Sequence, residues 1–247
     1  MITQKMMIIN PLPFQNSTQK PIRNHTDQSK EAIKMVEVTS GIHAINLSET
    51  EGLPLECYLL NCDEGLILID TGMRPSAIER IEKELKTIGK DWKDIKICLI
   101  THRHGDHIKN LKRVKELTDA EIIVHEGDAE AIERETGVEV KGVGDGYRLP
   151  HCGGIVLVHV PGHTDGNCCY YLPEKKAIIV GDTIFADEKG ELIPPPEKYS
   201  QDPERAKREI KRLLNYDFNI LLLTHGENIL KDAKEKIKEL CLKLGII

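Results

Sequence analysis

Hydrophobic and polar positions alternate along the chain with two different periods, and these periods distinguish strands from helices. A period of two over residues 35–39 (MVEVT) and 42–47 (IHAINL) predicts half-buried strands. The runs CYLLNC and LILID flank a turn at Asp63–Gly65 and predict a paired strand hairpin. Six more apolar runs predict strands at 95–100, 120–125, 154–160, 168–172, 176–181 and 221–225.

Apolar residues at steps of three and four predict the helices. Ile78, Ile81, Leu85 and Ile88 would form one apolar face of a helix that begins after TGMRP. Asp202 and Pro203 are typical of a helix start, and they predict a helix over 202–214. Further helices are predicted near 107–117 and over 126–135 and 231–244. Strands mixed with helices, without an internal repeat, indicate an α+β fold in which helices cover sheets.

Residues 1–34 differ from the rest because they are polar, broken by prolines and without either period. Two interpretations remain open. The segment is an N-terminal extension that is loosely ordered or disordered, or it is a misassigned start of a gene that begins at Met35. We prefer the second, and expect no chemistry from this segment in either case. Residues 35–247 are predicted to form one catalytic domain.

Composition and charge narrow the class of protein. Of the 247 residues, 40% are hydrophobic and 30% are charged, which is typical of a globular protein. No apolar run is long enough to span a membrane, and no signal peptide is evident, so we expect a cytoplasmic protein. The net charge of −6, with both signs interspersed, argues against a nucleic-acid partner.

The sequence has seven cysteines, and no two of them form a CxxC motif. Most lie in apolar strands, so we expect small buried hydrophobic residues rather than disulfides or thiolate metal ligands. Their positions are 57, 62, 98, 152, 168, 169 and 241.

The segment Thr101–His107 (THRHGDH) contains three histidines and an aspartate directly after a predicted strand. In an extended loop His102 and His104 can converge on one ion, and Gly105 lets Asp106 and His107 turn toward a second. Imidazole and carboxylate ligands together suit zinc, with iron or manganese as alternatives. The segment therefore predicts ligands for two metal ions.

Single polar residues also follow three later strands. They are His163, Asp182 and His225. A lone histidine at a strand end is more often structural, but the joint occurrence indicates that one edge of the fold forms an active site.

These residues carry a family resemblance. The segment His102–His107 matches the HxHxDH signature of the metallo-β-lactamase superfamily, and His163, Asp182 and His225 match its later ligands. Asp70 in LIDTG matches its early aspartate. From about Met35 onward the chain resembles this superfamily, and within it the glyoxalase II-like and lactonase-like metallohydrolases. The resemblance implies a four-layer αββα sandwich with metals at one edge.

The resemblance also implies the role of each residue. It assigns one metal ion to His102, His104 and His163, the other to Asp106, His107 and His225, and the bridging position to Asp182. Asp106 and His225 are also expected to act in catalysis. Asp70 would brace the ligand loops from a second shell, cap its own turn, or do both.

The expected activity is that of a dinuclear zinc hydrolase. Two ions would share a hydroxide that attacks a small thioester, lactone or related ester. Only 22 residues follow His225, which leaves no room for the glutathione-binding domain of glyoxalase II and puts a glutathione thioester in doubt. In the lactonases that the chain resembles, a tyrosine after the bridging aspartate assists the substrate carbonyl; here Thr183, Ile184 and Phe185 follow Asp182, so that placement is missing. Tyr199 is a candidate substrate contact in its own loop, with surface packing as the alternative.

The main alternative is an oxidoreductase that uses a single iron in the same ligands, as in the persulfide dioxygenases of this superfamily. Phosphodiesterase and β-lactamase activities rank lower. We expect a small-molecule substrate; its identity, the native metal and the oligomeric state stay open.

Overall fold

The computed structural model describes residues 36–49 and 54–247. The predicted N-terminal extension, residues 1–34, lies outside the described residues. Within the described ranges, no helix combines the length and the apolar character needed to cross a bilayer.

The first sheet has seven strands in sequence order. Neighbours from β1 to β4 are antiparallel, whereas β4, β5, β6 and β7 are parallel. Cys62 pairs with Gly65 across the turn between β3 and β4, which confirms the predicted hairpin. The bounds are β1 Val36–Thr39, β2 Ile42–Asn46, β3 Glu56–Cys62, β4 Gly65–Ile69, β5 Ile95–Leu99, β6 Glu121–His125 and β7 Lys141–Val143.

The second sheet has five strands in the order β14-β11-β10-β9-β8, and β12 pairs with β13 beside it. Only the β11–β14 contact within this sheet is parallel, because the chain returns through helices before β14. The bounds are β8 Arg148–Leu149, β9 Ile155–His159, β10 Cys168–Leu172, β11 Ala177–Ile179, β12 Phe185–Ala186, β13 Leu192–Ile193 and β14 Ile220–Leu222.

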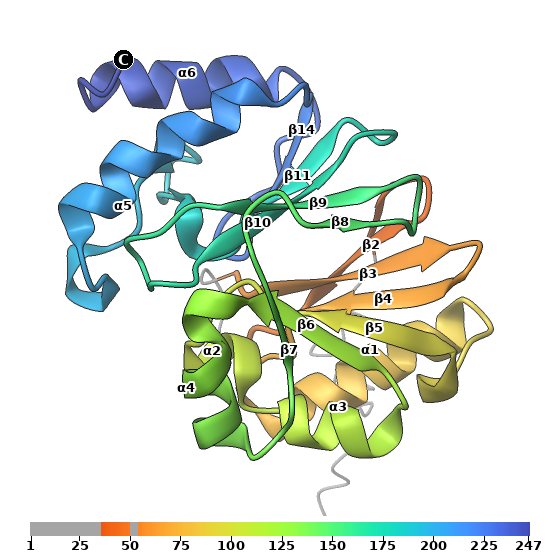
Figure 1. Cartoon of the computed structure of the whole chain (residues 1–247). Coiled ribbons are helices and arrows are strands. Elements are labelled where there is room, and N and C mark those ends of the chain that lie inside the picture. Colours follow the sequence, from red (N-terminus) through yellow and green to blue (C-terminus); the bar gives the residue numbers. More distant parts are fainter. Residues whose placement is uncertain (1–35, 50–53) are drawn as a thin grey trace, which may run out of the picture. The chain divides into compact units, whose positions relative to one another are not determined.

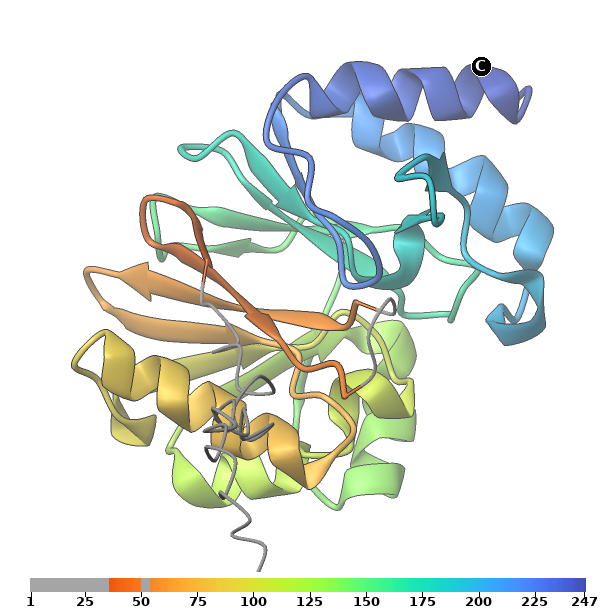
Figure 2. The ribbon, with the colours of Figure 1, turned by 180° about the vertical axis from the view of Figure 1, so that it is seen from behind.

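Helices cover the outer face of each sheet, as Figures 1 and 2 show. The first sheet is covered by α1 Pro75–Thr87, α2 Gly105–Ile108, α3 Leu111–Leu117 and α4 Glu126–Thr136. The second sheet is covered by α5 Pro203–Glu209, η4 Ile210–Asn215 and α6 Ala233–Lys243. Short 3₁₀ helices lie at η1 Trp92–Asp94, η2 Gly181–Thr183 and η3 Glu197–Tyr199.

The side chains of each strand divide between two layers of the core. In β4, Leu66 and Leu68 pack against the helices, while Ile67 and Ile69 pack against the opposite sheet. In β9, Leu157 faces the first sheet and Val158 faces α6 and η4. Successive strand residues point to opposite faces, so strands that are apolar throughout become buried on both sides. This confirms the predicted four-layer αββα sandwich.

Two predicted helices are interrupted. The helix expected near 107–117 is divided at Asn110, whose buried side-chain amide donates to the backbone carbonyls of Thr71 and Arg74 at 2.9 Å. The segment 202–214 starts as an α-helix capped by Asp202, as predicted, and continues from Ile210 as a 3₁₀ helix. Its tighter period of three places Ile210 and Leu213 together in the core.

The prediction that no cysteine forms a disulfide is wrong. Cys62, at the end of β3, is bonded to Cys152, in the turn between β8 and β9, with 4.9 Å between the Cα atoms. The other five cysteines are free and buried as expected, and burial raises the pKa of the Cys169 thiol to about 12. The pairing escaped prediction because it depends on how the two sheets stack, not on any local spacing.

Breaking this disulfide should destabilise the fold substantially. It closes a loop with a sequence separation of 90 residues and links one sheet to the other, so its loss releases much conformational entropy in the unfolded chain. We expect the free energy of unfolding to fall by about 2–5 kcal/mol on reduction. Urea denaturation with and without a reductant measures the effect. The double variant Cys62→Ser/Cys152→Ser is the control and should not respond to the reductant; an unchanged midpoint in the reduced natural protein would contradict the expectation.

Candidate metal centre

Five strand ends meet at one edge of the sandwich and carry the candidate ligands. Asp70 follows β4, and the segment 101–107 follows β5, both in the first sheet. His163, Asp182 and His225 follow β9, β11 and β14 of the second sheet. The site therefore needs both sheets, and no single element contains it.

Gly181 lets the two sheets approach each other at this edge. Its φ is +50°, and a Cβ atom there would lie 2.6 Å from the Cβ of Thr101. Both the left-handed backbone and the lack of space favour glycine. The close approach places Asp182 beside the segment that carries His102 and His107.

The first cluster consists of His102, His104, His163 and Asp182, with one ligand atom of each within 4.8 Å of the others. His104 Nδ1 is 2.9 Å from His163 Nε2. Asp182 Oδ2 lies 3.3 Å from His163 Nε2 and 3.9 Å from His102 Nε2. Three imidazoles and one carboxylate oxygen thus face a common point.

The second cluster consists of Asp106, His107, Asp182 and His225. Asp182 Oδ1 lies 3.1 Å from His107 Nε2 and 3.5 Å from His225 Nε2. Asp106 Oδ2 is 3.4 Å from the same nitrogen of His225. Asp182 therefore belongs to both clusters and presents a different oxygen to each.

The donor atoms fit a divalent metal ion. His102 Nε2, His107 Nε2 and Asp182 Oδ1 are buried and form no hydrogen bond with any described residue. Buried polar atoms rarely lack a partner, since leaving them unpaired is costly. A cation between the imidazoles and carboxylates would satisfy them, and this nitrogen and oxygen donor set suits zinc.

The electrostatics of the clusters differ. Burial and the neighbouring His107 imidazole hold the pKa of His102 well below its usual value. Burial also opposes protonation of His107, but the Asp70, Asp182 and Asp106 carboxylates outweigh it and raise the pKa of His107 well above its usual value. A cation bound at the second cluster would therefore compete with a proton for the His107 imidazole.

Asp70 contacts both the backbone and a candidate ligand. Its Oδ1 accepts from the Thr101 backbone N–H at 2.9 Å, and its Oδ2 accepts from the Thr101 hydroxyl at 2.8 Å. Oδ2 is also 2.8 Å from His107 Nδ1, which leaves Nε2 of that ring directed at Asp182. Asp70 itself has a φ of +63°. The geometry is compatible with both roles predicted for this residue, the turn and the support of ligands.

Several supporting contacts were not predicted from the sequence. His225 Nδ1 is 3.0 Å from the Pro54 carbonyl oxygen, and its ring stacks on Phe185 with 4.8 Å between centroids. His163 Nδ1 is 3.2 Å from the Ser200 hydroxyl, next to Tyr199 in the chain. Each of these contacts joins residues far apart in the sequence, so no local pattern gave a signal for it.

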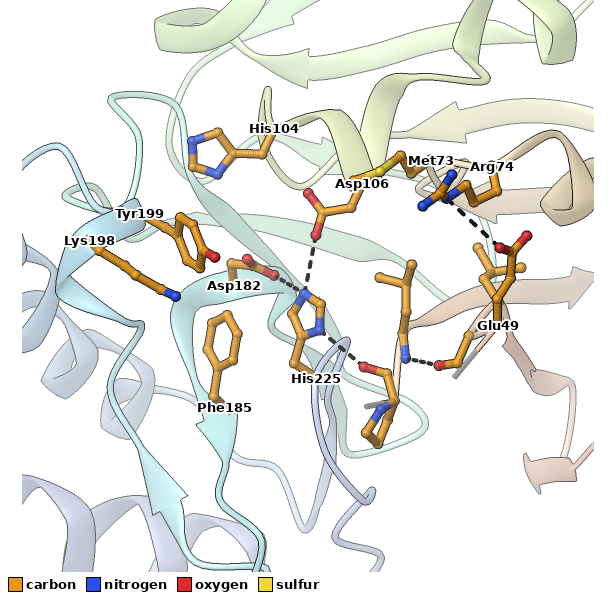
Figure 3. Close-up of a pocket in the computed structure, with 14 residues that line it drawn as sticks. Glu49, Met73, Arg74, His104, Asp106, Asp182, Phe185, Lys198, Tyr199 and His225 are labelled. Carbon is orange, nitrogen blue, oxygen red and sulfur yellow. Dashed lines mark hydrogen bonds and ion pairs between the residues drawn. The ribbon is translucent and has the colours of Figure 1, made fainter. Parts of the chain in front are cut away.

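A cavity of about 780 Å³ lies directly over the clusters. It is lined by four residues of the two clusters, His104, Asp106, Asp182 and His225 (Figure 3). Its remaining lining residues are Leu47, Ser48, Glu49, Pro54, Leu55, Met73, Arg74, Phe185, Lys198 and Tyr199. Tyr199 is 58% exposed, and Figure 3 shows its hydroxyl directed toward Asp182. Its ring is 4.5 Å from the Lys198 ammonium.

The remaining histidines lie elsewhere. His43, His125, His151 and His159 belong to neither cluster. His125 stacks on His159 with 3.7 Å between centroids and does not line the cavity. His25 lies outside the described residues.

The fold and the candidate ligands agree with the family to which the chain is similar in sequence. Residues 52–225 match the family model of the metallo-beta-lactamase superfamily. The chain belongs to this superfamily.

Within it, the curated relatives that this chain resembles are named as hydrolases, a probable metallo-hydrolase and a lactonase. The chain is 39% identical over 96 residues to hydroxyacylglutathione hydrolase of Rhizobium meliloti, a match that covers 38% of this chain but only 36% of that enzyme. It is 25% identical over 189 residues to the probable metallo-hydrolase YybB of Bacillus subtilis, and this match covers 72% of this chain and 83% of that protein. It is 27% identical over 210 residues to an N-acyl homoserine lactonase of Bacillus thuringiensis, and this match covers 72% of this chain and 82% of that enzyme.

Solved structures show the same fold. A metallo-beta-lactamase family protein from Thermus thermophilus is 20% identical, with a TM-score of 0.69 over 84% of this chain and 80% of that one. A beta-lactamase from Chitinophaga pinensis is 19% identical, with a TM-score of 0.67 over 91% and 96%. These similarities concern the architecture alone.

Proposed function

We propose that this protein is a dinuclear zinc hydrolase that cleaves a small thioester, lactone or related ester. His102, His104 and His163 would hold one ion, and Asp106, His107 and His225 the other. Asp182 would bridge them, and Asp70 would support the ligands from behind.

The observation that carries the proposal is the position of Asp182. Its two carboxylate oxygens face different clusters, Oδ2 toward His163 and Oδ1 toward His107. Both clusters are complete and share this carboxylate, which supports a site for two ions. The alternative oxidoreductase would use one iron in the same ligands, so the metal content of the protein distinguishes the two.

When bound, two divalent cations would lower the pKa of a water molecule, so that hydroxide forms at neutral pH, and would polarise the carbonyl under attack. Side chains of the protein would transfer the protons of the reaction. The Asp106 side chain is 24% exposed against 6% for Asp182, and it lines the cavity. Asp106 is therefore the carboxylate placed to take a proton from the nucleophile and pass it to the leaving thiolate or alkoxide. His225, braced by Phe185 and Pro54, would fix the orientation of Asp106.

The cavity favours a small and partly apolar substrate. Leu47, Leu55, Met73 and Phe185 supply apolar surface for an acyl group or a lactone ring. Lys198 and Tyr199 supply polar groups on another part of the lining. The relatives support the same chemistry, since hydroxyacylglutathione hydrolase and N-acyl homoserine lactonase are among the proteins this chain resembles.

Two measurements test the proposal. Metal analysis of protein purified without added metal should find two zinc equivalents per chain. Zinc-loaded protein assayed on a panel of thioesters, lactones, phosphodiesters and β-lactams should show its highest kcat/KM on a thioester or lactone. One iron per chain with oxygen-dependent turnover would support the dioxygenase instead, and a preference for phosphodiesters or β-lactams would contradict the proposed substrate class.

Tyr199→Phe should lower kcat/KM by about 2- to 13-fold, because one hydrogen bond to the substrate contributes about 0.5–1.5 kcal/mol. Steady-state kinetics on the best substrate of the panel measures the loss. The matched control is Tyr171→Phe, which removes a hydroxyl that donates to the Asp217 carbonyl away from the cavity. Equal kinetics in Tyr199→Phe and the natural protein would assign Tyr199 to surface packing.

A further inference from the structure

Asp128 is a buried carboxylate that the proposed chemistry does not use. It lies in the first turn of α4 and is 1% exposed. Its Oδ2 accepts from the Arg103 backbone N–H at 3.0 Å and from the Thr164 hydroxyl at 2.6 Å. Its Oδ1 accepts from the Gly166 backbone N–H at 3.0 Å and lies 3.4 Å from Arg103 Nε. Four donors therefore converge on one side chain.

These donors come from two loops that belong to different sheets. Arg103 stands between His102 and His104 in the loop after β5 of the first sheet. Thr164 and Gly166 follow His163 in the loop that joins β9 to β10 of the second sheet. One carboxylate thus ties together the two loops that supply all three imidazoles of the first cluster.

The packing around Asp128 leaves little room for movement. A Cβ atom on Gly166 would lie 2.4 Å from the Asp128 backbone nitrogen and 2.6 Å from its Cγ. A Cβ on Gly127 would lie 2.9 Å from the Asp165 carbonyl oxygen. The start of α4 and the His163 loop are therefore in direct contact.

The second cluster has other supports. His107 is held by Asp70, and His225 is held by the Pro54 carbonyl oxygen and Phe185. Among the hydrogen bonds and ion pairs of the described residues, none joins Asp128 to Asp106, His107 or His225. A change at Asp128 should therefore act on one cluster and spare the other.

We propose that Asp128 is a positioning residue that fixes the separation between the His102–His104 pair and His163. It acts on the first cluster alone, through the loops that it joins. This inference rests on the proposed function in so far as the two clusters bind two cations.

The test compares Asp128→Asn and Asp128→Ala with the natural full-length protein. Oδ1 and Oδ2 both accept backbone N–H groups, so the amide nitrogen of asparagine would face a donor at either position. Cation content is followed by titration with a graded series of chelators. Loss of a supporting contact costs about 10- to 100-fold in metal affinity. We expect this loss of affinity for one of the two zinc equivalents, while the affinity for the other is retained. After substitution with cobalt, the visible absorption of only one of the two sites should change.

Asp145→Asn is the matched control. Asp145 also accepts a backbone N–H, from His159, and pairs with an arginine, Arg212, but it touches neither cluster. It should leave both affinities unchanged. Thr164→Val removes one of the donors to Asp128, so it should lower the affinity for the same zinc equivalent by a smaller factor. If Asp128→Ala fails to fold, the result for Thr164→Val tests the inference in its place.

A readout without metal separates the two proposals. In the cation-free protein, the amide protons of Arg103 and Gly166 should exchange faster in the Asp128 variants, while that of Thr101, held by Asp70, should not. If the natural protein binds fewer than two cations, the proposed function fails and amide exchange alone decides the role of Asp128. The inference would be overturned if the Asp128 variants changed the exchange rates of all three amides equally or not at all. It would also be overturned if the variants weakened the binding of both cations equally.

Discussion

Replacing Asp182 with alanine should abolish turnover and lower the cation content, while the fold is largely retained. Removal of even a supporting residue of a metal site costs about 10- to 100-fold, so loss of the residue shared by both clusters should reduce kcat/KM by more than about 100-fold. The fold should survive because the close contacts of this carboxylate are with imidazoles of the site.

Three measurements check this result: kcat/KM on the best substrate, bound metal after dialysis, and the urea midpoint of the cation-free protein. Asp217→Ala is the control, since that aspartate is exposed and pairs with Lys176 at the surface. It should match the natural protein in all three. Turnover in Asp182→Ala within a few-fold of the natural value would contradict the bridging role of Asp182.

Asp70→Asn should weaken both the site and the fold. Asp70 is a buried acceptor of two donors from Thr101 and contacts the His107 ring. An amide nitrogen would replace one acceptor, so at least one buried donor would lose its partner, at a cost of about 1–3 kcal/mol in the free energy of unfolding. Loss of the support to His107 should also reduce cation affinity at the second cluster by about 10- to 100-fold.

Asparagine tolerates the left-handed backbone found at Asp70, so the effect can be attributed to the side chain. Asp232→Asn is the matched control, because Asp232 also has a left-handed φ, +56°, but lies at the start of α6, outside both clusters. Chemical denaturation and chelator titration measure the two effects. Unchanged affinity at the second cluster would show that Asp70 serves its own turn only.

The sequence was informative wherever one strand or one helix decides the outcome. The hairpin of β3 and β4 follows from two apolar runs around Asp63–Gly65, and the buried face of α1 follows from Ile81 and Leu85. Helix ends were less predictable. Asn110 interrupts a helical pattern because its amide is needed by the carbonyls of Thr71 and Arg74, residues remote in the chain.

The sequence by itself determined which chemical groups this protein could bring to a site. Histidines and aspartates stand directly after apolar strands, and their joint occurrence predicts an active site at one edge of the fold. The family resemblance rests on these same positions.

Only the tertiary structure decided how those groups meet. The direction of two of the imidazoles is set by a distant partner, Asp70 for His107 and Pro54 for His225. The contacts of Asp128 and the disulfide from Cys62 to Cys152 each join one sheet to the other. Local periodicity predicts which face of a helix or strand is buried, but it does not predict which other element packs against that face. The stacking of the two sheets supplies that missing relation, and it places the two clusters and the cavity over them.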